Sequence, residues 1–150
     1  MYFLDTNVLM HYANDDRRRD KIDKHIARVG AENVKVSSIT LYELHTKLIK
    51  AKVGKQNIDR LAAIIKGFGV INFNSAAALA AAKARALLEE TGKPIGDADQ
   101  LLAGHAKAEK AVIVTNNTQH FIRVHGLKLE DWIKWPAPNG SSCAPPPPSR

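Results

Sequence analysis

Short apolar runs recur along this chain and alternate with stretches in which apolar residues return every three or four positions. Runs of that kind, rich in β-branched and aromatic residues, are typical of buried strands. They cover Tyr2 to Leu4, Val34 to Val36, Val70 to Phe73 and Val112 to Thr115. The longer spacing is that of helices with one apolar face. It covers Ile22 to Val29, Leu41 to Ala51, Ile58 to Ile65, Ala76 to Leu88 and Leu101 to Ala108.

The alternation of strands and helices predicts an α/β fold of three layers, α/β/α. Its central, mainly parallel sheet has four to five strands and is covered by helices on both faces. The last folded element is expected over Leu127 to Trp132. Residues 136–150 are rich in Pro, Ser and Gly and lack apolar periodicity, so we expect one domain over residues 1–135 and a disordered tail beyond it.

The composition narrows the classes of function. Lys and Arg number 22 against 15 Asp and Glu, and the formal charge of +7 favours a polyanionic partner such as nucleic acid. A surplus of Lys can also serve solubility alone. The one cysteine, Cys143, lies in the predicted tail, so no disulfide framework or thiolate metal cluster is expected and a reducing cytoplasm is favoured. No signal peptide or membrane span is predicted.

Acidic residues follow the first two predicted strands. Asp5 comes directly after the first strand, where Thr6-Asn7 can turn the chain into a helix and hydrogen-bond the carboxylate. Asp5 could equally be a helix N-cap. Glu43 lies one turn into the helix after the second strand. It could instead close a capping box with Thr40, although Ser37-Ser38 offers another cap.

Two further carboxylates, Asp97 and Asp99, open a later helix. Residues two apart on a helix point about 200° away from each other, so only one can face a shared site. Asp97 with Gln100 fits a cap and its N3 partner. Asp99 shares the face of Leu102 and Ala103, which packs toward the sheet. We therefore assign Asp97 to structure and Asp99 to chemistry.

The fourth predicted strand ends in hydroxyl and amide groups, those of Thr115, Asn116 and Asn117. They could orient a water or a metal-bound carboxylate, or form an ordinary turn. The carboxyl ends of strands meet at one edge of an open α/β sheet, so these groups are expected near the three acids.

Gathered carboxylates repel one another, and Mg²⁺ or Mn²⁺ removes that repulsion while accepting oxygen ligands. Asp5, Glu43 and Asp99 are therefore the predicted metal ligands. An acidic metal site on a basic protein suits a nuclease, because the metal polarises a phosphoryl oxygen and supplies the attacking water. The histidines lack the spacing of a zinc site. The basic residues that could surround the site are Arg17, Arg18, Arg19, Lys21, Lys47, Lys50, Lys52 and Lys55.

Several motifs resemble those of one known family. They are Leu4-Asp5-Thr6-Asn7, Ser38 to Glu43, Pro94-Ile95-Gly96 with Asp99, Val114 to Thr118 followed by Phe121, and Leu129-Glu130-Asp131-Trp132. Together they resemble the VapC toxins, PIN-domain endoribonucleases of bacterial toxin–antitoxin systems, from Tyr2 to about Trp135. The resemblance implies a PIN-like fold, Mg²⁺ bound by Asp5 and Asp99, Glu43 completing the acidic group, and support from Thr115 with Asn116 or Asn117.

The resemblance also implies partners. VapC toxins are inhibited by a VapB antitoxin whose tail lies in the active-site groove, and operator DNA is bound through the antitoxin. A homodimer and a VapBC hetero-oligomer are therefore expected. The Pro-Ile-Gly and Thr-Asn-Asn segments are similar to those of toxins that cut initiator tRNA in the anticodon stem-loop, which implies translation arrest.

One departure from that pattern leaves alternatives open. The subgroup usually has an acidic residue where this chain has His120. Either three carboxylates suffice for one Mg²⁺, or His120 alters metal affinity and adds a pH dependence near neutrality. A catalytically inactive PIN-fold module that binds RNA or antitoxin is one alternative function. An aspartyl-phosphate phosphatase is another, weakened by Asn7 where a second acid would be expected.

Overall fold

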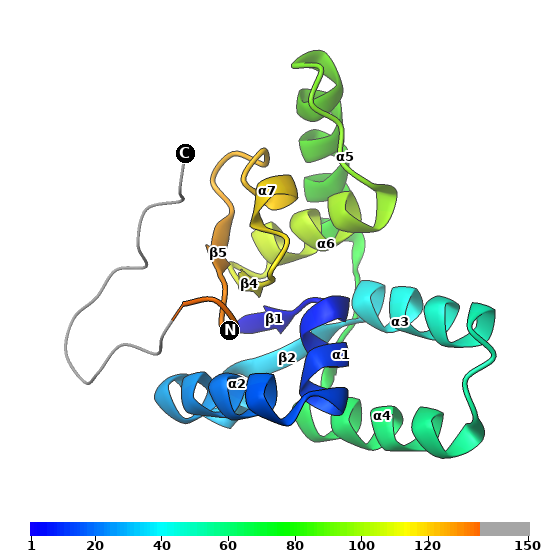
Figure 1. Cartoon of the computed structure of the whole chain (residues 1–150). Helices are drawn as coiled ribbons and strands as arrows, with labels where there is room; N and C mark the ends of the chain where they lie inside the picture. Colours follow the sequence, from blue (N-terminus) through cyan, green and yellow to red (C-terminus); the bar gives the residue numbers. More distant parts are fainter. Residues whose placement is uncertain (136–150) are drawn as a thin grey trace.

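A five-stranded, fully parallel sheet forms the centre of the computed structural model, which describes residues 1–135 (Figure 1). The strand order is β3-β2-β1-β4-β5, and Tyr2 of the central strand lies opposite both Val34 and Val112. The strands are β1 (Tyr2–Leu4), β2 (Val34–Ser37), β3 (Val70–Ile71), β4 (Val112–Val114) and β5 (Lys128–Glu130).

Seven helices and one 3₁₀ turn connect the strands within the described residues. The elements are α1 (Thr6–Asn14), α2 (Asp16–Val29), η1 (Ala31–Asn33), α3 (Ser38–Lys50), α4 (Lys55–Phe68), α5 (Ser75–Glu90), α6 (Asp97–Ala108) and α7 (Thr118–Phe121). No helix in residues 1–135 is both long and apolar enough to cross a membrane.

Side chains of the central strands alternate between two apolar cores. Leu4 and Val114 point into a core built with α1, α2, α3 and α4. Phe3 and Ile113 point into a second core built with α5, α6 and α7. Helices therefore cover both faces of the sheet, as Figure 1 shows, and the predicted three-layer α/β/α architecture is confirmed.

The helices α5 and α6 pack at unusually short range. A Cβ built on Gly104 of α6 would lie 2.3 Å from the Cα atom of Ala81 in α5, so only glycine fits there. The buried face of α5 consists of Ala77, Ala81, Ala84 and Leu88. The Ala-rich segment is thus a close-packed helix, because small side chains let two backbones approach.

The chain reverses its direction across the sheet at β1. From β1 it crosses to β2 on one side and later returns to β4 on the other, so the ends of β1 and β4 lie side by side. The backbone N–H of Asp5 donates to the Val114 carbonyl at 3.0 Å. Such switch points are where open α/β sheets place their ligand sites.

The predicted element types agree with the structure, whereas several boundaries differ. The periodicity did not delimit α1 or α7, and α2 begins at Asp16 rather than Ile22. Predicted strand Val70 to Phe73 has only two residues in the sheet. The predicted tail over residues 136–150 lies outside the described part of the chain.

Candidate active site

Asp5 is both a helix cap and a member of the acidic site. Its Oδ1 atom accepts a 2.7 Å hydrogen bond from the Thr6 backbone N–H, which caps α1. Its Oδ2 atom accepts a 2.8 Å bond from the Thr115 hydroxyl, which follows β4. The residue is only 5% exposed. The N-cap role is therefore confirmed, and it is compatible with the predicted chemical role, since the second carboxylate oxygen contacts the turn after β4.

Glu43 faces α1 rather than the start of its own helix. The hydroxyl of Ser37 accepts from the Ile39 N–H and caps α3, so the capping-box interpretation of Glu43 is wrong. Glu43 instead accepts a 2.8 Å bond from the Thr6 hydroxyl through Oε2. Its Oε1 atom lies 3.0 Å from the ammonium group of Lys47. Thr6 thus ties Glu43 to the residue that follows Asp5.

Asp99 and Asp97 point in different directions, as the helical geometry predicts. The Asp97 side chain is 87% exposed, whereas that of Asp99 is 20% exposed. The predicted cap at Asp97 is wrong, because Gly96 occupies the N-cap position without a side-chain bond. Asp97 is consequently the first helical residue. Gln100 donates to the Ile95 carbonyl at 2.7 Å instead of closing a capping arrangement.

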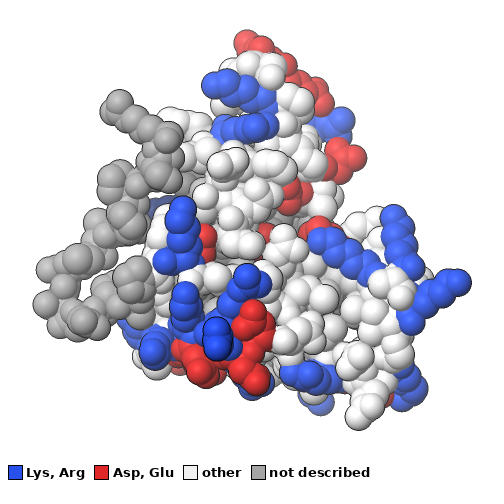
Figure 2. Space-filling model, viewed as in Figure 1, with Lys and Arg blue, Asp and Glu red and all other residues white. Residues whose placement is uncertain are grey.

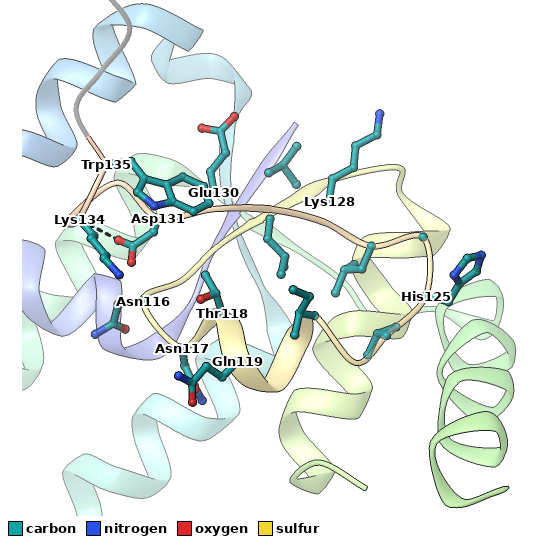
Figure 3. A pocket seen from close by; sticks show the side chains of 16 residues that line it. Asn116, Asn117, Thr118, Gln119, His125, Lys128, Glu130, Asp131, Lys134 and Trp135 are labelled. Atoms are coloured by element: carbon teal, nitrogen blue, oxygen red, sulfur yellow. Dashed lines mark hydrogen bonds between the residues drawn. The ribbon is translucent and has the colours of Figure 1, made fainter. Parts of the chain in front are cut away.

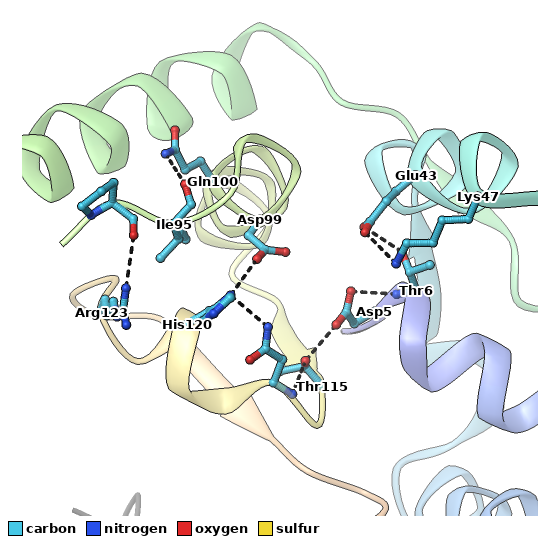
Figure 4. Close-up of polar contacts among 12 residues, drawn as sticks. Asp5, Thr6, Glu43, Lys47, Ile95, Asp99, Gln100, Thr115, His120 and Arg123 are labelled. Atoms are coloured by element: carbon cyan, nitrogen blue, oxygen red, sulfur yellow. Dashed lines mark hydrogen bonds and ion pairs between the residues drawn. The ribbon is translucent and has the colours of Figure 1, made fainter. Parts of the chain in front are cut away.

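The turn after β4 brings Thr115 and Asn117 into the polar network. The Asn117 N–H donates to the Thr115 hydroxyl at 3.0 Å, and its side-chain amide lies 3.0 Å from Nδ1 of His120. That same His120 nitrogen lies 3.3 Å from Oδ2 of Asp99. Figure 4 shows this chain of contacts running from Asp99 through His120 toward Thr115 and Asp5.

Asn116 takes a different position from its neighbours. It is exposed and lines an open hollow of about 900 Å³ between the β4–α7 turn and the segment from His125 to Trp135 (Figure 3). The hollow contains none of Asp5, Glu43 and Asp99. Of the two asparagines proposed to support the acids, Asn117 is the one that the structure brings to the network.

Burial and repulsion by neighbouring carboxylates disfavour the ionised forms of Asp5 and Asp99. The pKa of Asp5 is raised to about 6, mainly by burial and to a smaller extent by Asp99 and Glu43, against the hydrogen bonds from Thr115 and Thr6. Burial also raises the pKa of Asp99, and Glu43 adds to that rise while His120 and Lys47 oppose it. The three carboxylates therefore form one electrostatic group although they come from α3, α6 and the end of β1.

The donor chemistry of the group suits a hard dication, since every candidate ligand atom is a carboxylate or hydroxyl oxygen. Within residues 1–135 no three acidic, His or Cys side chains converge tightly enough to form a metal cage as they stand. Glu43 and Asp99 are each paired with a basic group, Lys47 and His120. The pKa of Asp5 is raised mainly by burial and also by Asp99 and Glu43, so an added positive charge would stabilise the ionised form of Asp5.

Among the candidate basic residues whose contacts the structure describes, most contact groups outside the acidic site. Arg18 contacts His11 and Asp15, and Arg19 lies over the Tyr12 ring at 4.8 Å. Figure 2 shows basic side chains interleaved with acidic ones over the region of α2, while further Lys and Arg extend over the α3 and α4 side. Lys47 differs from the others, because its partner is a carboxylate of the acidic site.

The PIN domain model matches residues 2–127 of this chain. The chain belongs to the PIN-domain family. Ribonuclease VapC2 of Rickettsia felis is 34% identical over 135 residues, which span 89% of this chain and 99% of that protein. The tRNA(fMet)-specific endonuclease VapC of Shigella flexneri is 39% identical over 97 residues, 65% of this chain and 74% of that protein.

A solved structure of DNA-bound VapBC from Salmonella typhimurium is also similar to this PIN-domain chain. Its TM-score is 0.77 at 30% identity, with 87% of this chain and 97% of that one covered. Within the PIN-domain family, this chain therefore belongs to the VapC group.

Two contacts of this PIN-domain site were not predicted from the sequence. The bond from the Thr6 hydroxyl to Glu43 depends on how α1 packs on α3, and no local pattern specifies that. The pairing of Lys47 with Glu43 follows the i, i+4 spacing of a helix, which the sequence does contain. The spacing alone does not show that the pair faces the acids.

Proposed function

We propose that this PIN-domain protein is a Mg²⁺-dependent endoribonuclease and the toxin of a type II toxin–antitoxin system. The observation that carries the proposal is the meeting of Asp5, Glu43 and Asp99 at the switch point of the sheet, where Asp99 and Glu43 raise the pKa of Asp5 and Glu43 raises that of Asp99. A group of carboxylates that is costly to ionise is suited to a bound dication and unsuited to a purely structural role.

Asp5, Glu43 and Asp99 would hold Mg²⁺, with Mn²⁺ as a substitute. The bound metal supplies a polarised phosphoryl oxygen and an activated water. Thr115 orients Asp5 through its hydroxyl, and Thr6 holds Glu43 beside the start of α1. His120 orients Asp99 in place of a fourth acid, and Asn117 holds His120 from the other side.

The proposed substrate is tRNA, specifically the anticodon stem-loop of initiator tRNA, so that cleavage arrests translation in the cytoplasm. Support comes from a Shigella flexneri relative that is named a tRNA(fMet)-specific endonuclease. The net charge of +7 is consistent with an RNA substrate.

The proposed partner is a VapB-type antitoxin that neutralises the enzyme, within a hetero-oligomer built on a VapC homodimer. The similar Salmonella protein was solved as DNA-bound VapBC, and a Rickettsia felis VapBC2 complex was solved with a fragment of promoter DNA. Operator DNA would be contacted through the antitoxin.

The test compares two acids of one helix turn in a cleavage assay. Purified protein is incubated with bulk tRNA in Mg²⁺, in Mn²⁺ and in EDTA, and the cut ends are mapped. Asp99→Asn should reduce cleavage at least about 100-fold, because a metal ligand and its charge are lost. Asp97→Asn should cleave like wild type and change stability by less than about 0.5 kcal/mol, because Asp97 is exposed and caps nothing.

Two results would contradict the proposal. Cleavage that persists in EDTA would show that the acids do not act through a metal. An absence of cleavage by the wild type on tRNA and on total RNA, in either metal, would favour the inactive binding module instead.

A further inference from the structure

Lys47 occupies an unusual position for a surface lysine. It lies one turn after Glu43 on α3, and its ammonium group is 3.0 Å from Oε1 of Glu43. The other oxygen of that carboxylate accepts from Thr6 at 2.8 Å. Figure 4 shows the Lys47 ammonium beside Glu43, on the side of α3 that faces Thr6 and Asp5. A fixed positive charge therefore lies at the edge of the acidic site.

An ordinary i, i+4 ion pair is the alternative explanation for this contact. Lys55 and Asp59 of α4 form such a pair at 2.8 Å, with the lysine side chain 89% exposed. Exposed pairs of this kind contribute little to helix stability. The Lys47 pair differs in two respects. Its acid is anchored to another helix by Thr6, and the charge of Lys47 acts on Asp99 of α6 as well.

We propose that Lys47 is a phosphate-positioning residue that pairs with Glu43 while the acids hold no metal and binds an RNA phosphate once a dication has taken that carboxylate. The ammonium and the dication compete for the same Glu43 oxygen, so one leaves as the other binds. The four-carbon stem of lysine allows its charge to move within reach of a neighbouring anion. The released ammonium is then held at the edge of the site, where RNA must lie to be cut.

The inference rests on the proposed function, and it makes two predictions of opposite sign. Removing the positive charge should strengthen metal binding, because a competitor for Glu43 is gone. The same change should weaken RNA binding, because one phosphate contact is lost. If the Glu43–Lys47 pair only stabilised α3, removing the charge would neither strengthen metal binding nor weaken RNA binding.

The first measurement is metal binding without RNA. Free Mn²⁺ is followed by electron paramagnetic resonance in titrations of wild type, Lys47→Met, Lys47→Arg and Lys55→Met. Lys47→Met should bind Mn²⁺ about threefold to tenfold more tightly, as expected for loss of a like charge at the partly exposed edge of the site. Lys47→Arg and Lys55→Met should match wild type. Lys55→Met is the matched control, because it also removes a lysine from an i, i+4 pair.

The second measurement is bulk tRNA cleavage at saturating Mn²⁺. Lys47→Met should raise KM about fivefold to tenfold with kcat within about twofold of wild type. The slope of log(kcat/KM) against log salt should become shallower by about 0.7 to 1, the loss of one phosphate contact. Lys47→Arg should restore both values, since the charge is kept.

A Mn²⁺ affinity or a KM for Lys47→Met equal to that of Lys55→Met would overturn the inference. Glu43→Gln separates this failure from failure of the proposed function. Should Glu43→Gln abolish cleavage and weaken Mn²⁺ binding while the two lysine variants coincide, only the role of Lys47 is wrong. Should Glu43→Gln change neither quantity, the proposed metal site itself is wrong.

Discussion

Asp5 both stabilises the folded protein through its hydrogen bonds and destabilises it through its buried charge. Its hydrogen bonds from Thr6 and Thr115 hold the start of α1 beside the end of β4. Its burial among other acids raises its pKa to about 6, far above the usual value of 3.8. At neutral pH the folded protein must therefore keep a charge that the unfolded chain carries at lower cost. Active sites often hold such unfavourable charges.

This conflict predicts a pH-dependent effect of Asp5→Asn on stability. Between pH 3.8 and about 6 the folded protein retains a proton on Asp5 that the unfolded chain has released. Protonated Asp5 thus makes its full favourable contribution to the free energy of unfolding below pH 3.8. This contribution is lost as the pH rises through about 6. The free energy of unfolding of Asp5→Asn, relative to wild type, should rise by up to about 3 kcal/mol between about pH 4 and pH 8.

Urea unfolding in EDTA at both pH values measures this effect. Asp97→Asn is the control, because it removes an exposed carboxylate that lies outside the buried acidic site. A flat difference for Asp5→Asn would show that the acid is not destabilised by its surroundings.

The clustering of the three acids and the hydrogen bonds of Asp5 with Thr6 and Thr115 were predictable from the sequence, whereas the cap of α6 and the partners of Glu43 were not. Asp5, Glu43 and Asp99 follow strand ends or begin helices, and strand ends gather at one edge of a parallel sheet. The N-cap of α6 was misassigned because Gly96 and Asp97 are both acceptable caps, and only the backbone geometry selects Gly96. The Thr6–Glu43 bond depends on packing between helices that are distant in sequence.

At the scale of elements, periodicity identified helices with a clear apolar face and failed elsewhere. The start of α2, from Asp16 to Lys21, is entirely charged, so only the cap at Asp15 marks where the helix begins. The helix α7 has four residues, too few for a helical period to be visible. The strand β3 is similarly short, because only Val70 and Ile71 pair with β2.

The contact between α5 and α6 predicts that Gly104→Ala is destabilising. The added methyl group would meet the backbone of Ala81 at 2.3 to 2.4 Å, and a backbone cannot rotate away as a side chain can. The two helices would have to separate, which should lower the free energy of unfolding by about 1 to 3 kcal/mol. Urea unfolding at neutral pH measures the change.

Gly67→Ala in α4 is the matched control. A Cβ at Gly67 meets nothing within 4 Å, so the same substitution should be neutral or stabilise by up to about 1 kcal/mol through helix propensity. Equal effects of the two substitutions would mean that α5 and α6 are not in close contact.

At the scale of the whole molecule, an acidic site lies within a basic protein. The net charge is +7, while Asp5, Glu43 and Asp99 gather at one edge of the sheet. The net positive charge of the protein attracts a long polyanion, whereas the carboxylates of the acidic site attract a small cation. A protein inhibitor can exploit the second attraction by placing a basic side chain among the acids.

We therefore expect a VapB-type antitoxin to insert an arginine at the acidic site, where its planar fork can bind carboxylate oxygens. Neutralising one acid should then cost about 2 to 5 kcal/mol of binding, mostly as faster dissociation. The measurement is binding of the cognate antitoxin to wild type and to Asp5→Asn by surface plasmon resonance. Equal affinity and equal dissociation rates would place the inhibitory contact on the apolar helices instead.

The central position of β1 has a consequence for the moment at which the protein becomes active. The strand nearest the N-terminus is completed on both sides only when β2 and β4 have paired with it. Asp5 is synthesised early, whereas Asp99 follows it by 94 residues and Thr115 by 110 residues. Contacts so distant in sequence form late. A nascent chain that has not yet reached Thr115 therefore lacks an assembled site.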